Sequence, residues 1–181
     1  MRFVESELPG AYLIDLEPHI DERGFFARSY CAREFAEHGL PENFPQCNLS
    51  RNRRKGTLRG MHYDAPPSAE SKLVRCVSGA VYDVIIDLRP ESATRLKWTG
   101  AELSAANGRA LFVPAGFAHG FLTLSDDCDV FYQMGDYFRA GAGRGLRWND
   151  PTFGVVWPSA PLIMSERDAS YPDFELAAVG G

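Results

Sequence analysis

Residues 108–119, GRALFVPAGFAH, join a short apolar run to a tight Pro-Ala-Gly turn and end in a histidine. Apolar runs of similar length recur along most of the chain and are separated by turn residues such as Gly, Pro, Asn and Asp. Many short runs at regular spacing are typical of an all-β barrel or sandwich. We therefore predict short helical segments at 33–38 and 165–169 and strands at 11–16, 25–30, 44–50, 57–63, 72–77, 80–88, 98–103, 110–114, 118–124 and 129–136.

The composition is that of an ordinary soluble domain, with 181 residues, 45% hydrophobic and 24% charged. We expect one domain over residues 1–181, with a frayed tail at 176–181. A net charge of −5 argues against a nucleic-acid partner, so an anionic ligand would need a local basic pocket. No apolar run has the length of a membrane span, and no signal-peptide core is present, so we expect a cytoplasmic protein without a membrane partner. The four cysteines are expected to be reduced and mostly buried.

The spacing of Gly108, Pro114, Gly116 and His119 resembles the second sequence motif of the cupins, in which a strand and a tight turn lead to a histidine facing into a barrel. The first cupin motif is incomplete, because Asp64 stands where a second histidine is expected. The resemblance implies an all-β fold: a double-stranded β-helix, or jelly-roll barrel, with a few short helices.

This resemblance also raises the possibility of a metal site. A set of two histidines and two carboxylates could be formed by His62, Asp64, Glu70 and His119. Against this, a Pro-Pro pair at 66–67 disrupts the spacing, and Lys72 would place a positive charge beside the cation. We therefore expect no metal and no other cofactor. His119 can equally be a hydrogen-bonded histidine of the barrel wall or a ligand contact.

Residues 56–63, GTLRGMHY, bring a guanidinium and an imidazole close together, and Lys72 follows shortly after. A histidine beside a lysine in a barrel pocket can act as a general base, while the lysine stabilises an oxyanion. A structural role for His62 explains this segment equally well. Taken alone, Tyr132 is typical of a core tyrosine and Asp168 of a carboxylate at a helix start.

The ordered set of motifs resembles the dTDP-4-dehydrorhamnose 3,5-epimerase family of nucleotide-sugar enzymes. The similarity extends from about residue 14 to residue 168. It rests on the segments DERGFF at 21–26, QCNLS at 46–50, LRGMHY at 58–63, KLVRC at 72–76, DVIIDLR at 83–89, PAGFAHGF at 114–121, WNDP at 148–151, WP at 157–158 and SERD at 165–168.

The resemblance implies a metal-free, homodimeric isomerase that epimerises carbons next to a 4-keto group. His62 matches the base that removes the protons from C5 and then C3, and Asp168 matches the carboxylate that pairs with this histidine. Lys72 matches the group that holds the enolate oxygen. Tyr132 matches the acid that returns a proton to the opposite face of the sugar.

The resemblance also implies a nucleotide-diphosphate sugar as the substrate. Arg59 matches a pyrophosphate contact, and His119 is implied to line the same pocket. The nucleotide and sugar pocket would further include Arg23, Gln46 and Asn48. In the family, the segment matching residues 21–30 crosses to the neighbouring subunit, which would make the protein a homodimer.

Two positions differ from the family pattern, and one of them suggests an alternative substrate. Asp64 replaces a glutamine next to the base and could alter the sugar preference. Arg28 replaces a glutamate near the thymine, and its donors would suit the acceptor edge of cytosine, which suggests a CDP-linked 4-keto-6-deoxyhexose. Alternatively, Arg28 points to solvent or to the pyrophosphate. Two other hypotheses are a metal-dependent cupin oxygenase and a non-catalytic jelly roll that binds sugar nucleotides.

Overall fold

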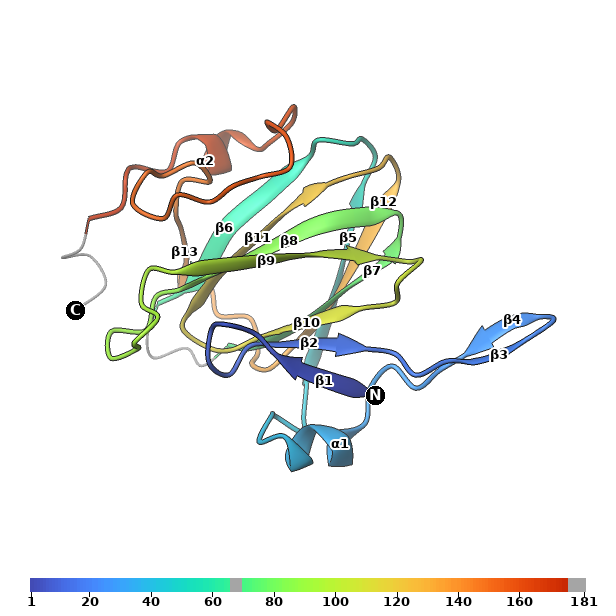
Figure 1. Cartoon of the computed structure of the whole chain (residues 1–181). Helices are drawn as coiled ribbons and strands as arrows, with labels where there is room; N and C mark the ends of the chain where they lie inside the picture. The colour runs from blue at the N-terminus through green and yellow to red at the C-terminus, as the bar shows by residue number, and fades with distance from the viewer. Residues whose placement is uncertain (66–69, 176–181) are drawn as a thin grey trace.

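The computed structural model describes residues 1–65 and 70–175. Two antiparallel sheets face each other and form a jelly-roll barrel, which confirms the predicted fold class (Figure 1). The six-stranded sheet has the order β1 (Arg2–Glu5), β2 (Tyr12–Asp15), β10 (Ala110–Val113), β7 (Lys72–Ser78), β12 (Cys128–Met134) and β5 (Gln46–Asn52). The five-stranded sheet has the order β13 (Gly143–Gly145), β6 (Leu58–Asp64), β11 (Phe117–Thr123), β8 (Ala80–Asp87) and β9 (Trp98–Ser104).

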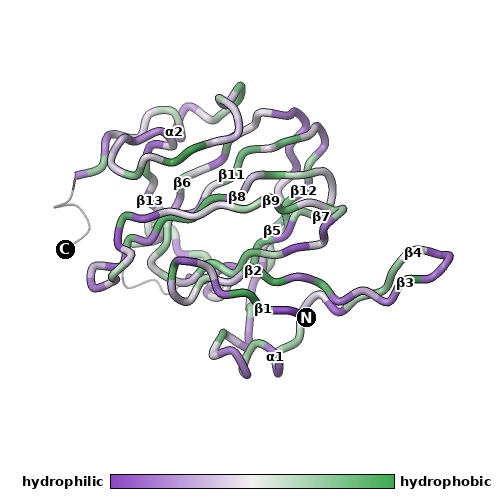
Figure 2. The backbone as a smooth tube through the Cα atoms, in the orientation of Figure 1, coloured by the Kyte–Doolittle hydropathy of each residue, from purple (hydrophilic) through white to green (hydrophobic). Residues whose placement is uncertain are grey.

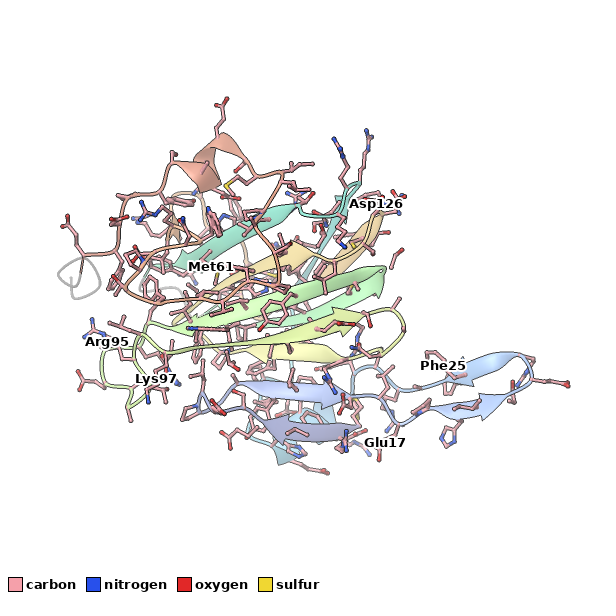
Figure 3. All side chains as sticks on the ribbon, turned by 45° about the horizontal axis from the view of Figure 1, so that its top comes forward. Glu17, Phe25, Met61, Arg95, Lys97 and Asp126 are labelled. Atoms are coloured by element: carbon pink, nitrogen blue, oxygen red, sulfur yellow. The ribbon has the colours of Figure 1, made fainter. Side chains whose placement is uncertain are left out.

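Three further elements lie outside these sheets. The hairpin of β3 (His19–Asp21) and β4 (Gly24–Phe26) projects from the barrel, and Figure 3 shows Phe25 on this projection. Helix α1 (Ala32–Glu37) packs Phe35 against the six-stranded sheet, and helix α2 (Glu166–Ala169) lies beside β6. Within the described residues, no helix is long and apolar enough to cross a membrane.

The five-stranded sheet is covered on both faces, which explains why every residue of β11 is buried. Its inner face joins the barrel core, where Ile85 and Phe121 pack against Val74 and Val130 of the other sheet. Its outer face is covered by the C-terminal segment, residues 146–175, through a second hydrophobic cluster that includes Phe153. Hydrophobic segments accordingly run along the strands of both sheets, whereas the hairpin tip is hydrophilic (Figure 2). Burying a side chain of this size contributes about 1.5–3 kcal/mol, so the second cluster holds the C-terminal segment and α2 in place.

Most of the predicted elements are confirmed within a few residues, but some predictions were wrong. The strand predicted at 25–30 ends at Phe26, and β1, β3 and β13 were not predicted. The cysteines were expected to be mostly buried, yet Cys47 is exposed and Cys31 is only half-buried, because both lie outside the two sheets' shared core. The predicted frayed tail at 176–181 lies outside the described residues.

A buried carboxylate, Asp87, fixes the loop that follows β8. It accepts hydrogen bonds from the Arg89 guanidinium at 2.7 and 2.9 Å and from the hydroxyls of Ser92 and Thr94 at 2.6 and 2.8 Å. Burial alone would raise the pKa of Asp87, but these hydrogen bonds outweigh it and lower the pKa to about 2. The ionised form therefore stabilises the folded state.

We expect Asp87→Asn to lower the free energy of unfolding by about 3 kcal/mol at pH 7, since an amide cannot replace a carboxylate that accepts from four donors. The folded-state pKa lies below the unfolded one, so this contribution is present above pH ~4 and is lost as the pH falls toward 2. Urea unfolding of both proteins at pH 7, 4 and 3 should show the difference shrinking with acidity. Glu91→Gln, an exposed carboxylate in the same loop, is the control and should change little. A difference independent of pH would contradict this role for Asp87.

Candidate active site

A cavity of about 670 Å³ lies between the two sheets and is closed on one side by the C-terminal segment. One wall comes from β6 and β11 and the other from β5, β7 and β12. Most of the predicted site residues line it, namely Asn48, Arg59, His62, Lys72, His119, Tyr132 and Asp168.

His62 and Asp168 form the predicted pair. The Nε2 atom of His62 lies 2.7 Å from Oδ1 of Asp168, whose side chain is only 6% exposed, whereas that of His62 is 47% exposed toward the cavity. Ser165 caps α2 by accepting a hydrogen bond from the Asp168 backbone N–H, which fixes the carboxylate against β6. With Nε2 engaged, Nδ1 is the ring nitrogen left to take a proton. This arrangement suits a general base whose cationic form is stabilised by a buried carboxylate.

A β-bulge explains how Arg59 and His62 reach the same cavity. Residues three apart in a regular strand point to opposite faces of the sheet. On β6, however, Arg59 pairs with Phe121 and His62 pairs with His119, so β6 has two residues opposite the single Gly120 of β11. The extra residue turns both side chains into the cavity. Only glycine fits at Gly120, because a Cβ there would lie 2.8 Å from the Arg59 carbonyl oxygen.

Lys72 begins β7 on the other wall of the cavity, and its ammonium contacts the Glu70 carboxylate. The two side chains are 13% and 11% exposed, so this ion pair is largely removed from solvent. Glu70 was considered above as a metal ligand, but in the structure its carboxylate forms an ion pair with the Lys72 ammonium.

Tyr132 lies on β12, on the wall opposite His62. Burial raises the pKa of Tyr132 above its ordinary value, so the phenol keeps its proton at neutral pH. Its hydroxyl lies 3.5 Å from the Ser50 hydroxyl, and its ring meets the His119 ring edge-on at 6.1 Å. The cavity thus has a proton acceptor on one wall and a neutral proton donor on the other.

His119 contacts a second buried carboxylate, with Nε2 at 2.9 and 3.0 Å from the oxygens of Asp83. Burial raises the pKa of Asp83, and the contact with His119 opposes this only in part. His62 and His119 are therefore bonded to different carboxylates. In residues 1–65 and 70–175, no three His, Cys, Asp or Glu side chains gather in a way that could hold a metal ion.

Three predicted binding residues do not line this cavity. Arg23 is exposed on the hairpin and bonds to Asp21. Arg28 donates a hydrogen bond to Glu34 at 2.8 Å, at the base of the hairpin. Gln46 lies beside the cavity residue Asn48, with its Nε2 3.3 Å from the Asn48 Oδ1, and accepts from the Phe138 backbone N–H.

Several lining residues were not predicted, and Arg167 is the most important of them. It precedes Asp168 on α2, and its guanidinium lies over the Tyr171 ring at 5.9 Å from the ring centre. Ser50 and Met134 lie two positions from Asn48 and Tyr132 on their strands, so the strand alternation was a signal that could have indicated them. The lining also includes Ser165, which opens the SERD segment at 165–168, and Ile163 and Met164, which have no comparable sequence pattern.

Comparisons with known proteins agree on one family of enzymes. The sequence model of a family described as dTDP-4-dehydrorhamnose 3,5-epimerase matches residues 5–175. The chain is 39% identical over 175 residues to the Shigella flexneri enzyme of that name, covering 96% of each chain. It is 42% identical to that of Methanothermobacter thermautotrophicus, covering 94% of this chain and 92% of the relative.

Solved structures agree with these relatives. The Bacillus anthracis dTDP-4-dehydrorhamnose 3,5-epimerase, with TDP and PPi bound, has a TM-score of 0.91 and 39% identity, covering 96% of this chain and 99% of that one. The Legionella pneumophila dTDP-6-deoxy-D-glucose-3,5-epimerase, in complex with dTDP-4-keto-L-rhamnose, has a TM-score of 0.90 and 34% identity, covering 98% and 94%.

Proposed function

The chain belongs to the dTDP-4-dehydrorhamnose 3,5-epimerase family, and from this premise we propose that it is an isomerase acting on a nucleotide-linked 4-keto-6-deoxyhexose. The substrate is dTDP-4-dehydro-6-deoxy-D-glucose, which is inverted at C3, C5 or both, and inversion at both carbons gives dTDP-4-dehydro-L-rhamnose. We also propose that residues 1–181 act as one domain in the cytoplasm, in line with four cysteines that form no disulfide.

The 4-keto group of the sugar makes deprotonation of the neighbouring carbons possible. A hydrogen on a carbon next to the ketone becomes acidic only when the enolate is stabilised. His62 removes this proton, and the Asp168 carboxylate stabilises the resulting imidazolium. Lys72 holds the oxygen that becomes negative, and Tyr132 returns a proton from the other side. The observation that carries this proposal is the placement of base and acid on opposite walls of one cavity.

The diphosphate and the nucleotide require further contacts. Arg59 is held by the Asn52 side-chain oxygen at 2.7 Å and, with Arg167, supplies the positive charge for the diphosphate. The dTDP-linked substrate is favoured over the CDP-linked alternative, since the relatives are named for dTDP sugars. In the structure, Arg28 also donates through Nη1 to Glu34, which occupies one of the donors that were suggested to recognise cytosine.

The other two hypotheses have less support. A cupin oxygenase needs a gathered set of metal ligands, whereas His62 and His119 each contact a separate carboxylate. A module that only binds sugar nucleotides has no use for a proton acceptor and a neutral proton donor on opposite walls of one cavity.

Solvent deuterium tests the proposed function. The protein is incubated in D₂O with the dTDP-linked and CDP-linked 4-keto-6-deoxyglucose, and the C3 and C5 signals are followed by proton NMR. We expect deuterium to enter C5 and C3 of the dTDP sugar together with inversion. Absence of exchange in both sugars would overturn the proposal, and faster turnover of the CDP sugar would restore the cytidine alternative.

We further propose a homodimer in which the β3–β4 hairpin reaches the neighbouring subunit. The hairpin carries exposed Ile20, Phe25 and Phe26, and the free edge strand β5 carries exposed Leu49. A second copy would cover this apolar surface and the unpaired edge. It would also bring Arg23 to the partner's cavity, which this subunit's own Arg23 does not line.

Light scattering at micromolar concentration should therefore give twice the monomer mass. The double variant Phe25→Ser with Phe26→Ser should shift the mass toward the monomer and lower kcat/KM by about tenfold or more, because the hairpin contacts are lost. Val156→Ser, an exposed apolar side chain on the C-terminal segment, is the matched control and should leave both unchanged. A fully active wild-type monomer would refute the dimer.

A further inference from the structure

A smaller cavity of about 160 Å³ adjoins the substrate cavity. His62 on one wall and Lys72 on the other line both cavities, and so does Arg167, so the two cavities meet at these side chains. Glu70 lines only the smaller cavity. Its carboxylate contacts the Lys72 ammonium, which lies where the two cavities meet.

The Lys72 side chain needs a partner to hold its ammonium in place. Its backbone is fixed, since β7 pairs Lys72 with Val113 of β10 and with Met134 of β12. The side chain itself is long and flexible, and ordering it costs about 2 kcal/mol of rotamer entropy. Glu70 makes the one ion pair that the structure records for this ammonium among the described residues.

The surrounding charges make this contact more important. Arg144 and Arg167 line the smaller cavity, and Arg59 lines the larger one, so three guanidinium groups repel the ammonium. The carboxylates that oppose them are Asp64 in the smaller cavity, Asp168 in the larger one and Glu70 in direct contact. Of these, Glu70 is the carboxylate whose ion pair with the ammonium is recorded, and it is therefore placed to hold that group.

We propose that Glu70 is a positioning residue for Lys72, holding the ammonium where it meets the enolate oxygen. This inference rests on the proposed function, in which Lys72 stabilises the enolate. Glu70 is not among the residues that line the substrate cavity, and its recorded ion pair is with Lys72, so its proposed effect on the reaction runs through Lys72.

The expected signature is a change in kcat without a change in KM. The negative charge on the enolate oxygen develops only as the reaction proceeds. A misplaced ammonium therefore stabilises the transition state less well, whereas the binding of the substrate is unchanged. Glu70→Gln should lower kcat about tenfold and leave KM within about twofold. Glu70→Asp keeps the charge on a shorter side chain and should recover part of the rate. Glu102→Gln removes an exposed carboxylate on β9 and is the control for the change in net charge.

A double-mutant cycle decides whether Glu70 acts through Lys72. Lys72→Met should lower kcat by about 10²–10³-fold, which deuterium incorporation at high enzyme concentration can still follow. In that background, Glu70→Gln should have no further effect, and melting temperatures of all variants show whether they are folded. Independent, multiplicative effects, or a higher kcat in Glu70→Gln, would overturn the inference while leaving the proposed function intact. Near-normal kcat in Lys72→Met would remove the proposed role of Lys72 and with it the inference about Glu70, whereas the isomerase function is tested separately by the deuterium exchange of the wild-type protein.

Discussion

Replacing His62 by alanine is expected to slow deuterium exchange at C3 and C5 by ~10²–10⁴-fold, the usual cost of losing a general base. The imidazole is the proposed proton acceptor on its wall of the cavity, with Nε2 bonded to Asp168 and Nδ1 left for the substrate. Because the side chain is about half-exposed, its removal leaves no hole in the hydrophobic core. The variant should therefore fold, and proton NMR in D₂O should show that both carbons keep their hydrogens.

The matched control for this experiment is His38→Ala, which removes a histidine that stacks on Phe3 far from the cavity lining. It should exchange at the wild-type rate. Near-normal exchange in a folded His62→Ala protein would exclude His62 as the base. Loss of exchange at only one of the two carbons would show that a group other than His62 deprotonates the carbon that still exchanges.

Changing Tyr132 to phenylalanine is expected to separate exchange from inversion. His62 can still remove a proton and return a deuteron on its own face of the sugar, so exchange should persist. Inversion needs a proton from the opposite wall, where the variant has only a ring edge, and it should fall by ~10²–10⁴-fold. NMR measures both quantities in one sample, since deuteration and the configuration of the sugar appear as separate signals.

Tyr82→Phe serves as the control, because Tyr82 lies on β8 and packs against Trp157 outside the cavity. It should leave the ratio of inversion to exchange unchanged. An equal loss of exchange and inversion in Tyr132→Phe would mean that the phenol assists deprotonation and does not supply the second proton.

The barrel could be predicted because its strands are long enough to show apolar runs between clear turns. The missed elements lack this signal. Strand β13 consists of Gly143, Arg144 and Gly145, and it is a strand only because its backbone pairs with β6. Strands β1 and β3 are short and mostly exposed, so little apolar patterning distinguishes them from loops.

The family resemblance proposed the candidate site residues, most of which line one cavity, but it did not predict their arrangement. The three-residue spacing of Arg59 and His62 predicts opposite faces in a regular strand, and only the pairing of β6 with β11 reveals the bulge at Gly120. Glu70 was considered as a metal ligand because sequence gives residue types and not contacts. Its role beside Lys72 depends on a contact within the fold that no sequence pattern encodes.

The two facing walls also determine which inhibitors this enzyme should bind best. A sugar carbon that loses its hydrogen becomes flat, and only a flat centre lies equally close to His62 on one wall and Tyr132 on the other. A nucleotide-linked analogue with a permanently trigonal carbon at C5 or C3 and an anionic oxygen beside Lys72 would resemble the reaction's highest-energy species. Such a compound should bind more tightly than either sugar epimer, and the same geometry offers a design rule for selective ligands.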